Sequence, residues 1–142
     1  MSDILTTGKC LCGEVKYTIT GEPLRMIQCH CKDCQRATGT GHISNAFFKK
    51  DQVEISGELK SFDITAASGN TNRRHFCPNC GSRIYNEITA REGIIGIHVG
   101  CCDNNDWYEP NAVIYTDDRA GWDLTSADVP NHAAMPPPPP AK

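Results

Sequence analysis

The stretch that most constrains the fold is CPNCG at residues 77–81. Two cysteines separated by two residues, with a proline between them and a glycine after them, are typical of a tight turn that directs two sulfurs at one metal ion. A second pair, CLCG at residues 10–13, lies near the start of the chain, and CHCKDC at residues 29–34 holds three more cysteines. These groups predict metal binding.

The number of cysteines points in the same direction. The chain has nine cysteines among 142 residues. An odd number, with no export signal at the N-terminus and with spacings of one or two residues, favours metal ligation over a secreted disulfide framework. Thiols stay reduced in the cytoplasm, so we expect a cytoplasmic protein.

The overall charge disfavours two classes of partner. The net charge is −3, and the sequence contains no run of like charges. The basic surface of a protein that binds nucleic acid or anionic membranes is therefore not expected. No stretch approaches the roughly 18 apolar residues of a membrane span. We expect a soluble protein without nucleic-acid or membrane partners, and these patterns predict no oligomeric state.

The hydrophobic pattern predicts a mostly β fold of short strands with little helix. Between residues 14 and 20, Val15, Tyr17 and Ile19 alternate with polar residues, which is the period of a half-buried strand. A helical turn stopped by Gly39 is predicted at residues 35–38, and a loop at residues 66–72. The other predicted strands cover residues 42–48, 52–56, 58–63, 83–89, 94–99 and 112–116.

The length of the chain indicates one domain, which we place at residues 1–132. Its limited core is expected to benefit from a structural metal. Residues 133–142 include five consecutive prolines and are predicted to form a flexible or semi-rigid tail. The predicted role of the tail is that of a spacer, with recognition by a proline-reading domain as the alternative.

Spacing alone leaves two ways to divide the cysteines among metal ions. Residues 31–34 and 77–80 could be the knuckles of a zinc ribbon, but the gap between them exceeds the roughly 15–20 residues usual for that site. In the favoured division, the pair at residues 10–12 joins the pair at residues 77–80 in a closed four-thiolate site. The three cysteines of residues 29–34 then remain one ligand short of tetrahedral zinc.

Three motifs, in this order and with these spacings, resemble those of the glutathione-dependent formaldehyde-activating enzymes, a family that also includes centromere protein V. They are GKCLCG at residues 8–13, CHCKDCQRATG at residues 29–39 and FCPNCG at residues 76–81. The resemblance extends through GCCD at residues 100–103 and Glu109-Pro110 to Trp122, and it covers about residues 8–125.

The resemblance implies a zinc-held β-tent of short antiparallel strands with two zinc ions per chain. It implies a carbon-sulfur lyase that joins a small thiol, such as glutathione, to an aldehyde, such as formaldehyde, as an S-hydroxyalkyl thiohemiacetal, and that catalyses the reverse reaction. The implied ligands of a structural zinc are Cys10, Cys12, Cys77 and Cys80, and those of a catalytic zinc are Cys29, Cys31 and Cys34.

The charge of a three-thiolate site agrees with this chemistry. Three thiolates on Zn²⁺ leave a net charge of about −1, which makes the ion a weak activator of water. Such an ion suits the binding and ionisation of a fourth thiol. The alternative is a zinc-stabilised binding module without turnover, which the resemblance to centromere protein V permits.

Several other residues are candidates by their place in the sequence. His30, between two proposed ligands, could relay a proton, donate a hydrogen bond to a ligand or cap the loop. An anionic thiol needs cations near the zinc, and each candidate cation could also be a solvated surface charge. These candidates are Lys32, Arg36, Arg73 and Arg74. The remaining histidines within the matched region lack partner spacing and are predicted to be ordinary core or surface residues: His42, His75 and His98.

Cys101 and Cys102 depart from the family pattern, which usually has a small residue and a leucine at these positions. We interpret both as packed thiols of a loop, with a redox or ligand role as the alternative. A sulfur of either residue in the fourth position of the catalytic zinc would silence that site.

Overall fold

A computed structural model describes residues 3–125 and 129–136. Contacts divide the chain into two compact units. The first unit contains Met1–Met26 and Asn45–Glu109, and the second contains Ile27–Ser44 and Pro110–Lys142. Each unit has strands of its own and one of the cysteine clusters.

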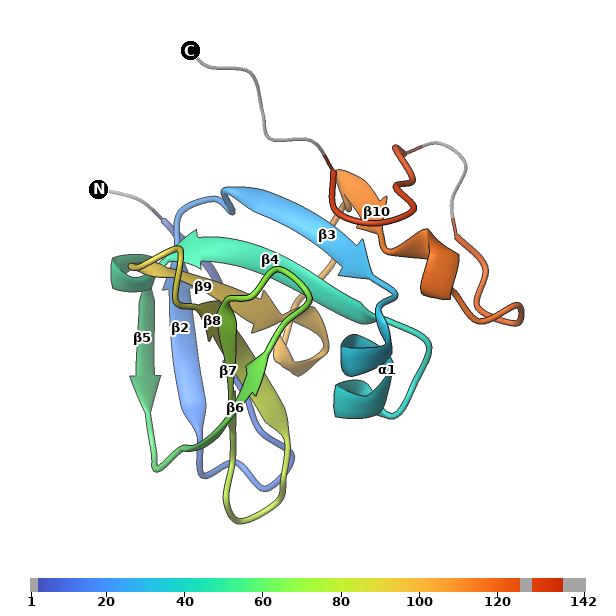
Figure 1. Ribbon diagram of the computed structural model, residues 1–142. Coiled ribbons are helices and arrows are strands. Elements are labelled where there is room, and N and C mark those ends of the chain that lie inside the picture. Colours follow the sequence, from blue (N-terminus) through green and yellow to red (C-terminus); the bar gives the residue numbers. More distant parts are fainter. Residues whose placement is uncertain (1–2, 126–128, 137–142) are drawn as a thin grey trace. The chain divides into compact units, whose positions relative to one another are not determined.

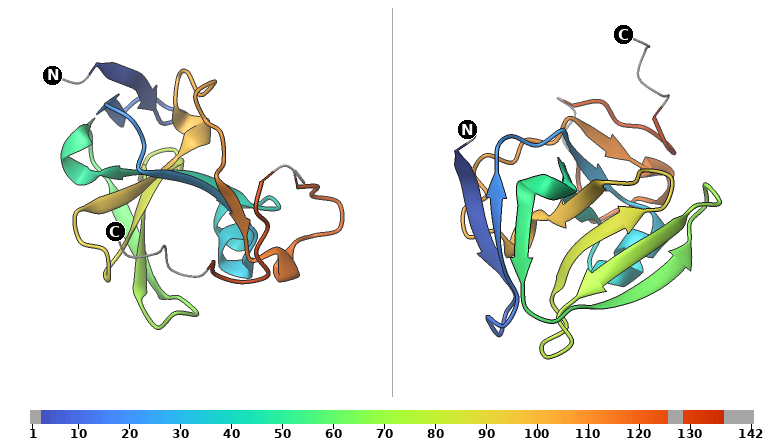
Figure 2. Two further views of the ribbon diagram at one scale, coloured as in Figure 1. Left: turned by 90° about the horizontal axis from the view of Figure 1, so that it is seen from above. Right: turned by 90° about the vertical axis from the view of Figure 1, so that its left-hand side faces the viewer.

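A three-stranded antiparallel sheet opens the first unit, in the order β1-β2-β5 (Figure 2). The strands are β1 (Ile4–Lys9), β2 (Lys16–Thr20) and β5 (Val53–Ser56). Alternate side chains on and before β2, from Val15 to Ile19, are buried, as the pattern predicted. β1 was not predicted, because its sequence is mostly polar and half of its residues are exposed.

Five further strands pair with antiparallel neighbours in the order β4-β9-β8-β7-β6. They are β4 (Ile43–Lys49), β6 (Lys60–Thr65), β7 (Thr71–Phe76), β8 (Arg83–Ile88) and β9 (Ile94–His98). In Figure 1, β6, β7 and β8 lie side by side. The sequence predicted β4, β8 and β9 to within about one residue at each end.

β7 was missed, and the prediction of a loop over residues 66–72 is wrong at its end, because Thr71 and Asn72 belong to this strand. The strand is polar on both faces, so it shows no period of two. Hydrogen bonds to β6 on one side and β8 on the other hold it extended. Tertiary pairing therefore overrides a weak local preference here.

Buried polar side chains join several of these strands. Asn45 donates from Nδ2 to Asn86 Oδ1 at 3.1 Å, and Asn86 donates from Nδ2 to Asn72 Oδ1 at 3.0 Å. Gly96 allows this arrangement, because a Cβ atom there would lie 2.8 Å from Asn86 Oδ1. Pairing of buried amides in this way avoids the cost of an unsatisfied polar group.

The hydrophobic core of the first unit includes two cysteines of the predicted four-thiolate site. Cys10 and Cys77 are 1% and 0% exposed and pack with aliphatic and aromatic side chains from both sheets. The other buried members of the core are Val15, Tyr17, Ile19, Ala46, Phe48, Ile84, Tyr85, Ile95, Ile97, Val99 and Cys102.

The second unit contains one parallel strand pair and one short α-helix. β3 (Arg25–Cys29) runs parallel to β10 (Ala112–Ile114), with Ile27 opposite Ala112 and Cys29 opposite Ile114. The expectation of antiparallel strands therefore fails for this pair, because the long intervening segment allows the crossover that parallel pairing requires. A 3₁₀ helix, η3 (Thr116–Asp118), follows β10.

The α-helix, α1 (Lys32–Thr38), begins three residues before the predicted turn. The reason is Cys31, whose sulfur caps the helix by accepting the N–H of Cys34. The predicted stop is present, since Gly39 adopts a left-handed backbone with φ of 74° and donates its N–H to Gln35 O at 2.8 Å. The mostly β fold with little helix is confirmed.

Hydrogen bonds continue into the segment predicted to be a tail. The backbone N–H groups of Tyr115 and Asp117 donate to the carbonyl oxygens of Ala134 and Ala133, respectively. Prolines 137–140 of the predicted tail lie outside the described residues. The placement of a single domain at residues 1–132 with a tail from residue 133 stays a prediction.

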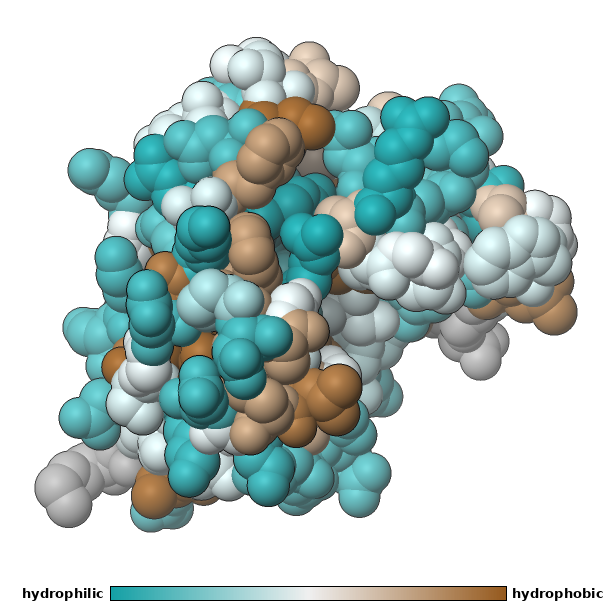
Figure 3. Space-filling view, turned by 90° about the horizontal axis from the view of Figure 1, so that it is seen from below, coloured by the Kyte–Doolittle hydropathy of each residue, from teal (hydrophilic) through white to brown (hydrophobic). Residues whose placement is uncertain are grey.

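The surface carries several exposed apolar side chains, among them Leu11 and Phe62 in the first unit and Trp122 and Leu124 in the second. On the face shown in Figure 3, apolar residues are interspersed with polar ones. Scattered exposed apolar residues are normal for folded proteins. Within the described ranges, no helix is long and apolar enough to cross a membrane.

Candidate active site and metal centres

The four-sulfur cluster of the first unit consists of Cys10, Cys12, Cys77 and Cys80, whose sulfurs all lie within 4.8 Å of one another. Cys12 Sγ lies 3.5 Å from Cys10 Sγ and 3.7 Å from Cys77 Sγ. Zinc–sulfur bonds of about 2.3 Å in a tetrahedron place neighbouring sulfurs about 3.8 Å apart. The spacing of these sulfurs therefore fits one tetrahedral zinc ion.

The pKa is lowered for two thiols of this cluster, Cys10 and Cys80, and raised for Cys77. The N–H of Val15 donates to Cys10 Sγ at 3.2 Å. Cys80 Sγ donates to Ser82 Oγ at 3.3 Å, and the N–H of Leu11 donates to the same oxygen. When the thiol ionises, the hydroxyl can turn its own proton toward the sulfur. The hydroxyl of Ser82 and then its backbone N–H lower the pKa of Cys80 to about 5. A thiolate at neutral pH is the form that zinc binds.

The three-sulfur cluster of the second unit consists of Cys29, Cys31 and Cys34, whose sulfurs also lie within 4.8 Å of one another. Cys29 is the last residue of β3, Cys31 caps α1 and Cys34 lies in the first turn of that helix. Three sulfurs converge within six residues because the strand ends where the helix begins. The set fits a zinc ion with one coordination position left open.

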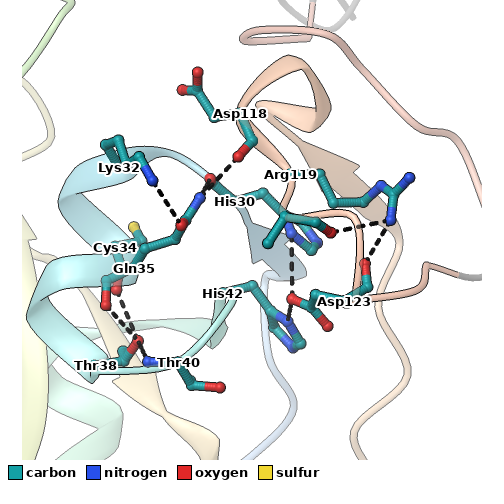
Figure 4. Close-up of polar contacts among 11 residues, drawn as sticks. His30, Lys32, Cys34, Gln35, Thr38, Thr40, His42, Asp118, Arg119 and Asp123 are labelled. Carbon is teal, nitrogen blue, oxygen red and sulfur yellow. Dashed lines mark hydrogen bonds and ion pairs between the residues drawn. The ribbon is translucent and has the colours of Figure 1, made fainter.

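Gln35 holds the turn that carries these sulfurs (Figure 4). Its Nε2 donates to the carbonyl oxygens of His30 and Asp118, each at 2.8 Å. The N–H of His30 donates to Ile114 O at 3.0 Å, which extends the pairing of β3 with β10 by one residue. The hydrogen bonds of the Gln35 side chain and of the His30 backbone therefore fix the backbone on either side of Cys31.

Electrostatics show why this cluster needs a cation. The sulfurs of Cys31 and Cys34, and then burial, raise the pKa of Cys29. Three thiolates at this spacing repel one another and resist ionising together. A divalent cation bound between the sulfurs reverses that preference, because a coordinated thiol is deprotonated.

Tyr115 is a residue near this cluster that sequence reasoning missed. Burial, and then the sulfurs of Cys29, Cys31 and Cys34, raise the pKa of its phenol. Among the described non-glycine residues it alone has a positive φ, 57°. A tyrosine gives no sequence signal for this backbone conformation, so the pattern of residues could not have identified it.

A third group of possible metal ligands lies in the same unit (Figure 4). It consists of His30, His42 and Asp123, with one ligand atom of each within 4.8 Å of the others. His42 Nδ1 lies 2.6 Å from Asp123 Oδ2, and His30 Nδ1 lies 3.4 Å from the same oxygen. His42 has no partner spacing in the sequence, and the fold brings Asp123 to it from 81 residues away.

Comparison with known proteins identifies the family of this chain and a solved structure of similar fold. The sequence model of a family described as glutathione-dependent formaldehyde-activating enzyme matches residues 5–118. The chain belongs to this family. A crystal structure of a protein from Rhodobacter sphaeroides has a similar fold, with a TM-score of 0.56 and 19% sequence identity. The match covers 73% of this chain and 96% of that one.

Because the family is described as glutathione-dependent, the cations that could bind an anionic thiol such as glutathione are of interest. Lys32 and Arg36 are exposed on α1, the helix that carries Cys34, and Lys32 Nζ donates to Gln35 Oε1 at 3.3 Å. In the first unit, Arg73 forms a two-point ion pair with Asp63 at 2.8 and 3.0 Å. Arg74 is only 4% exposed. A role in substrate binding stays a prediction for all four cations.

The two cysteines that depart from the family pattern have partners in the first unit. Cys102 is buried, with its sulfur 3.5 Å from the hydroxyl of Tyr17. Cys101 donates from Sγ to Arg83 O at 3.3 Å. Burial raises the pKa of both thiols, which keeps them protonated. These contacts support the interpretation of packed loop residues.

Two other histidines pack against neighbouring side chains in the first unit. His75 stacks on Tyr85 at 4.2 Å between ring centroids, and its Nε2 lies 2.8 Å from Glu87 Oε1. His98 is buried, with Nδ1 2.7 Å from Asn45 Oδ1. Burial, and then nearby guanidinium groups, lower the pKa of His98 to about 3, so it is neutral at physiological pH.

Proposed function

We propose that this protein is a zinc-dependent carbon-sulfur lyase that joins a small thiol, such as glutathione, to a small aldehyde, such as formaldehyde, and that also catalyses the reverse cleavage. The observation that carries the proposal is the convergence of three cysteine sulfurs beside a helix cap, while four other cysteines form a complete set of their own. Family membership supports the two classes of substrate.

The proposed reaction changes no oxidation state. The thiol sulfur bonds to the carbonyl carbon, the carbonyl oxygen becomes a hydroxyl, and the proton lost by the thiol ends on that oxygen. The site must therefore favour an ionised thiol and provide a proton near the oxygen, and it needs no oxidant or reductant.

Cys29, Cys31 and Cys34 would hold the zinc ion of this site, which supplies positive charge that lowers the pKa of a further sulfur ligand. The three side chains come from a strand end, a helix cap and a helical turn, so the backbone sets their positions. The four-sulfur cluster would hold a second, structural zinc ion, giving two ions per chain.

Tyr115 is the proposed proton donor to the substrate oxygen. Burial and the neighbouring sulfurs raise its pKa, so the phenol keeps its proton at neutral pH. Its left-handed backbone costs roughly 1–3 kcal/mol, which the surrounding structure must offset. Two hydrogen bonds do so in part: Tyr115 N–H donates to Ala134 O, and its carbonyl accepts the N–H of Asp118.

Lys32 and Arg36 are proposed to attract the carboxylates of an anionic thiol, because both are exposed on the helix that carries Cys34. A role of His30 as proton relay, and location in the cytoplasm, also stay predictions.

The test measures the exchange of glutathione between its free form and its formaldehyde adduct by NMR, with the zinc-loaded protein and with several other thiols and aldehydes. The uncatalysed exchange is subtracted. We expect exchange well above this background for the wild type and for Cys101→Ser, which changes a cysteine outside both clusters. Exchange at the background rate with every pair of substrates would refute the proposal.

A further inference from the structure

We propose that His30, His42 and Asp123 form a third metal site, separate from both cysteine clusters, that binds a divalent first-row transition ion such as Zn²⁺ or Fe²⁺. Two imidazoles and one carboxylate are a donor set that proteins use for both ions. In the second unit, all three residues converge although they come from three segments of the chain. Figure 4 shows the two rings on either side of the Asp123 carboxylate.

Burial of His30 provides an independent reason for a ligand. Its side chain is 0% exposed, and neither ring nitrogen makes a hydrogen bond of full geometry among the described residues. Nδ1 has only the 3.4 Å ion-pair contact with Asp123, and the backbone of Gly41 lies nearby. A buried polar group without a partner costs roughly 1–3 kcal/mol, so such groups in folded proteins call for an explanation. A metal ion bound to one ring nitrogen of His30 would give that buried nitrogen a partner.

The distances require only a small adjustment. Metal–nitrogen and metal–oxygen bonds of about 2.0–2.2 Å in a tetrahedron place neighbouring donors about 3.4 Å apart. His30 Nδ1 already lies 3.4 Å from Asp123 Oδ2, and His42 Nδ1 lies 2.6 Å from it. The contact of His42 with Asp123 has the length of a hydrogen bond and would lengthen by roughly 1 Å on metal binding.

The carboxylate is held against the backbone. A Cβ atom at Gly41 would lie 2.2 Å from Asp123 Oδ2 and 2.8 Å from Asp123 Cβ, so only glycine allows this approach. Arg119 donates from a terminal guanidinium nitrogen to the backbone carbonyls of Ala120 and Asp123, at 3.2 and 2.8 Å. The loop therefore holds the Asp123 carboxylate in one position next to the imidazole rings of His30 and His42.

Exposure increases from one ligand to the next. The side chains of His30, Asp123 and His42 are 0%, 13% and 25% exposed, respectively. An ion can thus enter past His42, and the three ligands leave coordination positions for water or another small oxygen ligand. A ring nitrogen that binds metal cannot relay a proton at the same time, so the metal site and the predicted relay role at that nitrogen are alternatives for His30.

The test adds Co²⁺ to zinc-loaded protein that was given only two equivalents of Zn²⁺ per chain, enough to fill both cysteine clusters and leave the third site free. We expect the wild type to bind one further ion, with ligand-field absorption and without sulfur-to-cobalt charge transfer. His42→Ala and Asp123→Asn should abolish this binding, and Gly41→Ala should weaken it at least tenfold by displacing the carboxylate. Zinc content should stay unchanged in all three variants.

Asp117→Asn is the matched control, because Asp117 is an exposed acid of the same unit outside the three-residue cluster. It should bind Co²⁺ as the wild type does. The proposal is overturned if zinc-loaded wild type binds no further ion, if Asp123→Asn binds it equally well, or if the added cobalt shows sulfur charge transfer and releases zinc.

Discussion

The two cysteine clusters differ in the reach of their ligands along the chain. The four-sulfur cluster joins Cys12 to Cys77 across 65 residues, and two of its members lie in the hydrophobic core. The three-sulfur cluster takes all its ligands from one strand end and the adjoining helix. A metal that closes a long loop stabilises a fold, whereas ligands from one short segment hold an ion with little effect on the rest of the chain.

The comparison also concerns the number of ligands. Four sulfurs complete a tetrahedron and leave zinc no free position, which is typical of structural sites. Three sulfurs leave a position for a substrate. On our proposal, the same residue type thus stabilises the fold in one unit and serves chemistry in the other.

The largest effect is expected from Cys77→Ser, which removes a ligand from the four-sulfur cluster. Structural zinc contributes about 10–16 kcal/mol in small zinc-binding peptides, which is comparable to the total stability of roughly 5–15 kcal/mol of a typical domain. The variant should therefore be largely unfolded, as measured by circular dichroism. Cys101→Ser, in the same unit but outside the cluster, should remain folded. A folded Cys77→Ser protein with full zinc content would contradict the structural role of the four-sulfur cluster and remove its difference from the three-sulfur cluster.

Cys31→Ser should have the opposite effect, with the fold kept and catalysis lost. Serine is a good helix cap and can accept the N–H of Cys34, so α1 should form as before. The variant should retain the zinc ion of the first unit and show thiol–aldehyde exchange at the background rate. If this variant is as unfolded as Cys77→Ser, the second cluster is structural and the enzyme proposal weakens.

The pH dependence of the free energy of unfolding can distinguish the contribution of a buried core histidine from that of the metal cluster in the first unit. Because burial lowers the pKa of His98 to about 3, the folded protein stays unprotonated there while the unfolded chain takes up a proton below about pH 6.5. The free energy of unfolding should fall as the pH drops from about 6.5 to about 3, by up to roughly 1.4 kcal/mol per unit.

Urea unfolding at several pH values measures this slope, with the zinc content determined at each point. His98→Gln removes the titrating group and should flatten the slope. An equal slope in the variant would assign the acid sensitivity to another group, such as the thiolates.

A smaller effect is expected from Tyr115→Phe, which tests the surroundings of the three-sulfur cluster. Loss of the phenol proton should slow exchange by about tenfold, which corresponds to about 1.4 kcal/mol of the barrier. Zinc content and melting temperature should not change. Tyr108→Phe, in the first unit, is the control and should leave the rate unaltered. Equal rates for both variants would remove Tyr115 from the mechanism.

Much of the fold was predictable from local patterns. Alternation around Tyr17 and the glycine after the helical turn each identified an element, and cysteine spacing identified the groups of sulfurs that the structure brings together. β7 could not be predicted in this way, because pairing on both sides, rather than its own side chains, holds it extended.

The candidate site was less predictable where residues meet across long separations. His42 and Asp123 lie 81 residues apart, and neither stands in a motif that suggests the other. The left-handed backbone of Tyr115 depends on its hydrogen bonds to later residues, not on its residue type. Tertiary structure alone supplies these two features.

Cadmium NMR of the cadmium-substituted protein tests the central claim most directly, because each sulfur ligand shifts the cadmium resonance. The account predicts separate resonances for the four-sulfur and three-sulfur clusters. Added glutathione should move only the three-sulfur resonance toward the four-sulfur range, and S-methylglutathione, which has no thiol, should not. The account is contradicted if glutathione leaves the three-sulfur resonance unchanged or shifts that of the four-sulfur cluster.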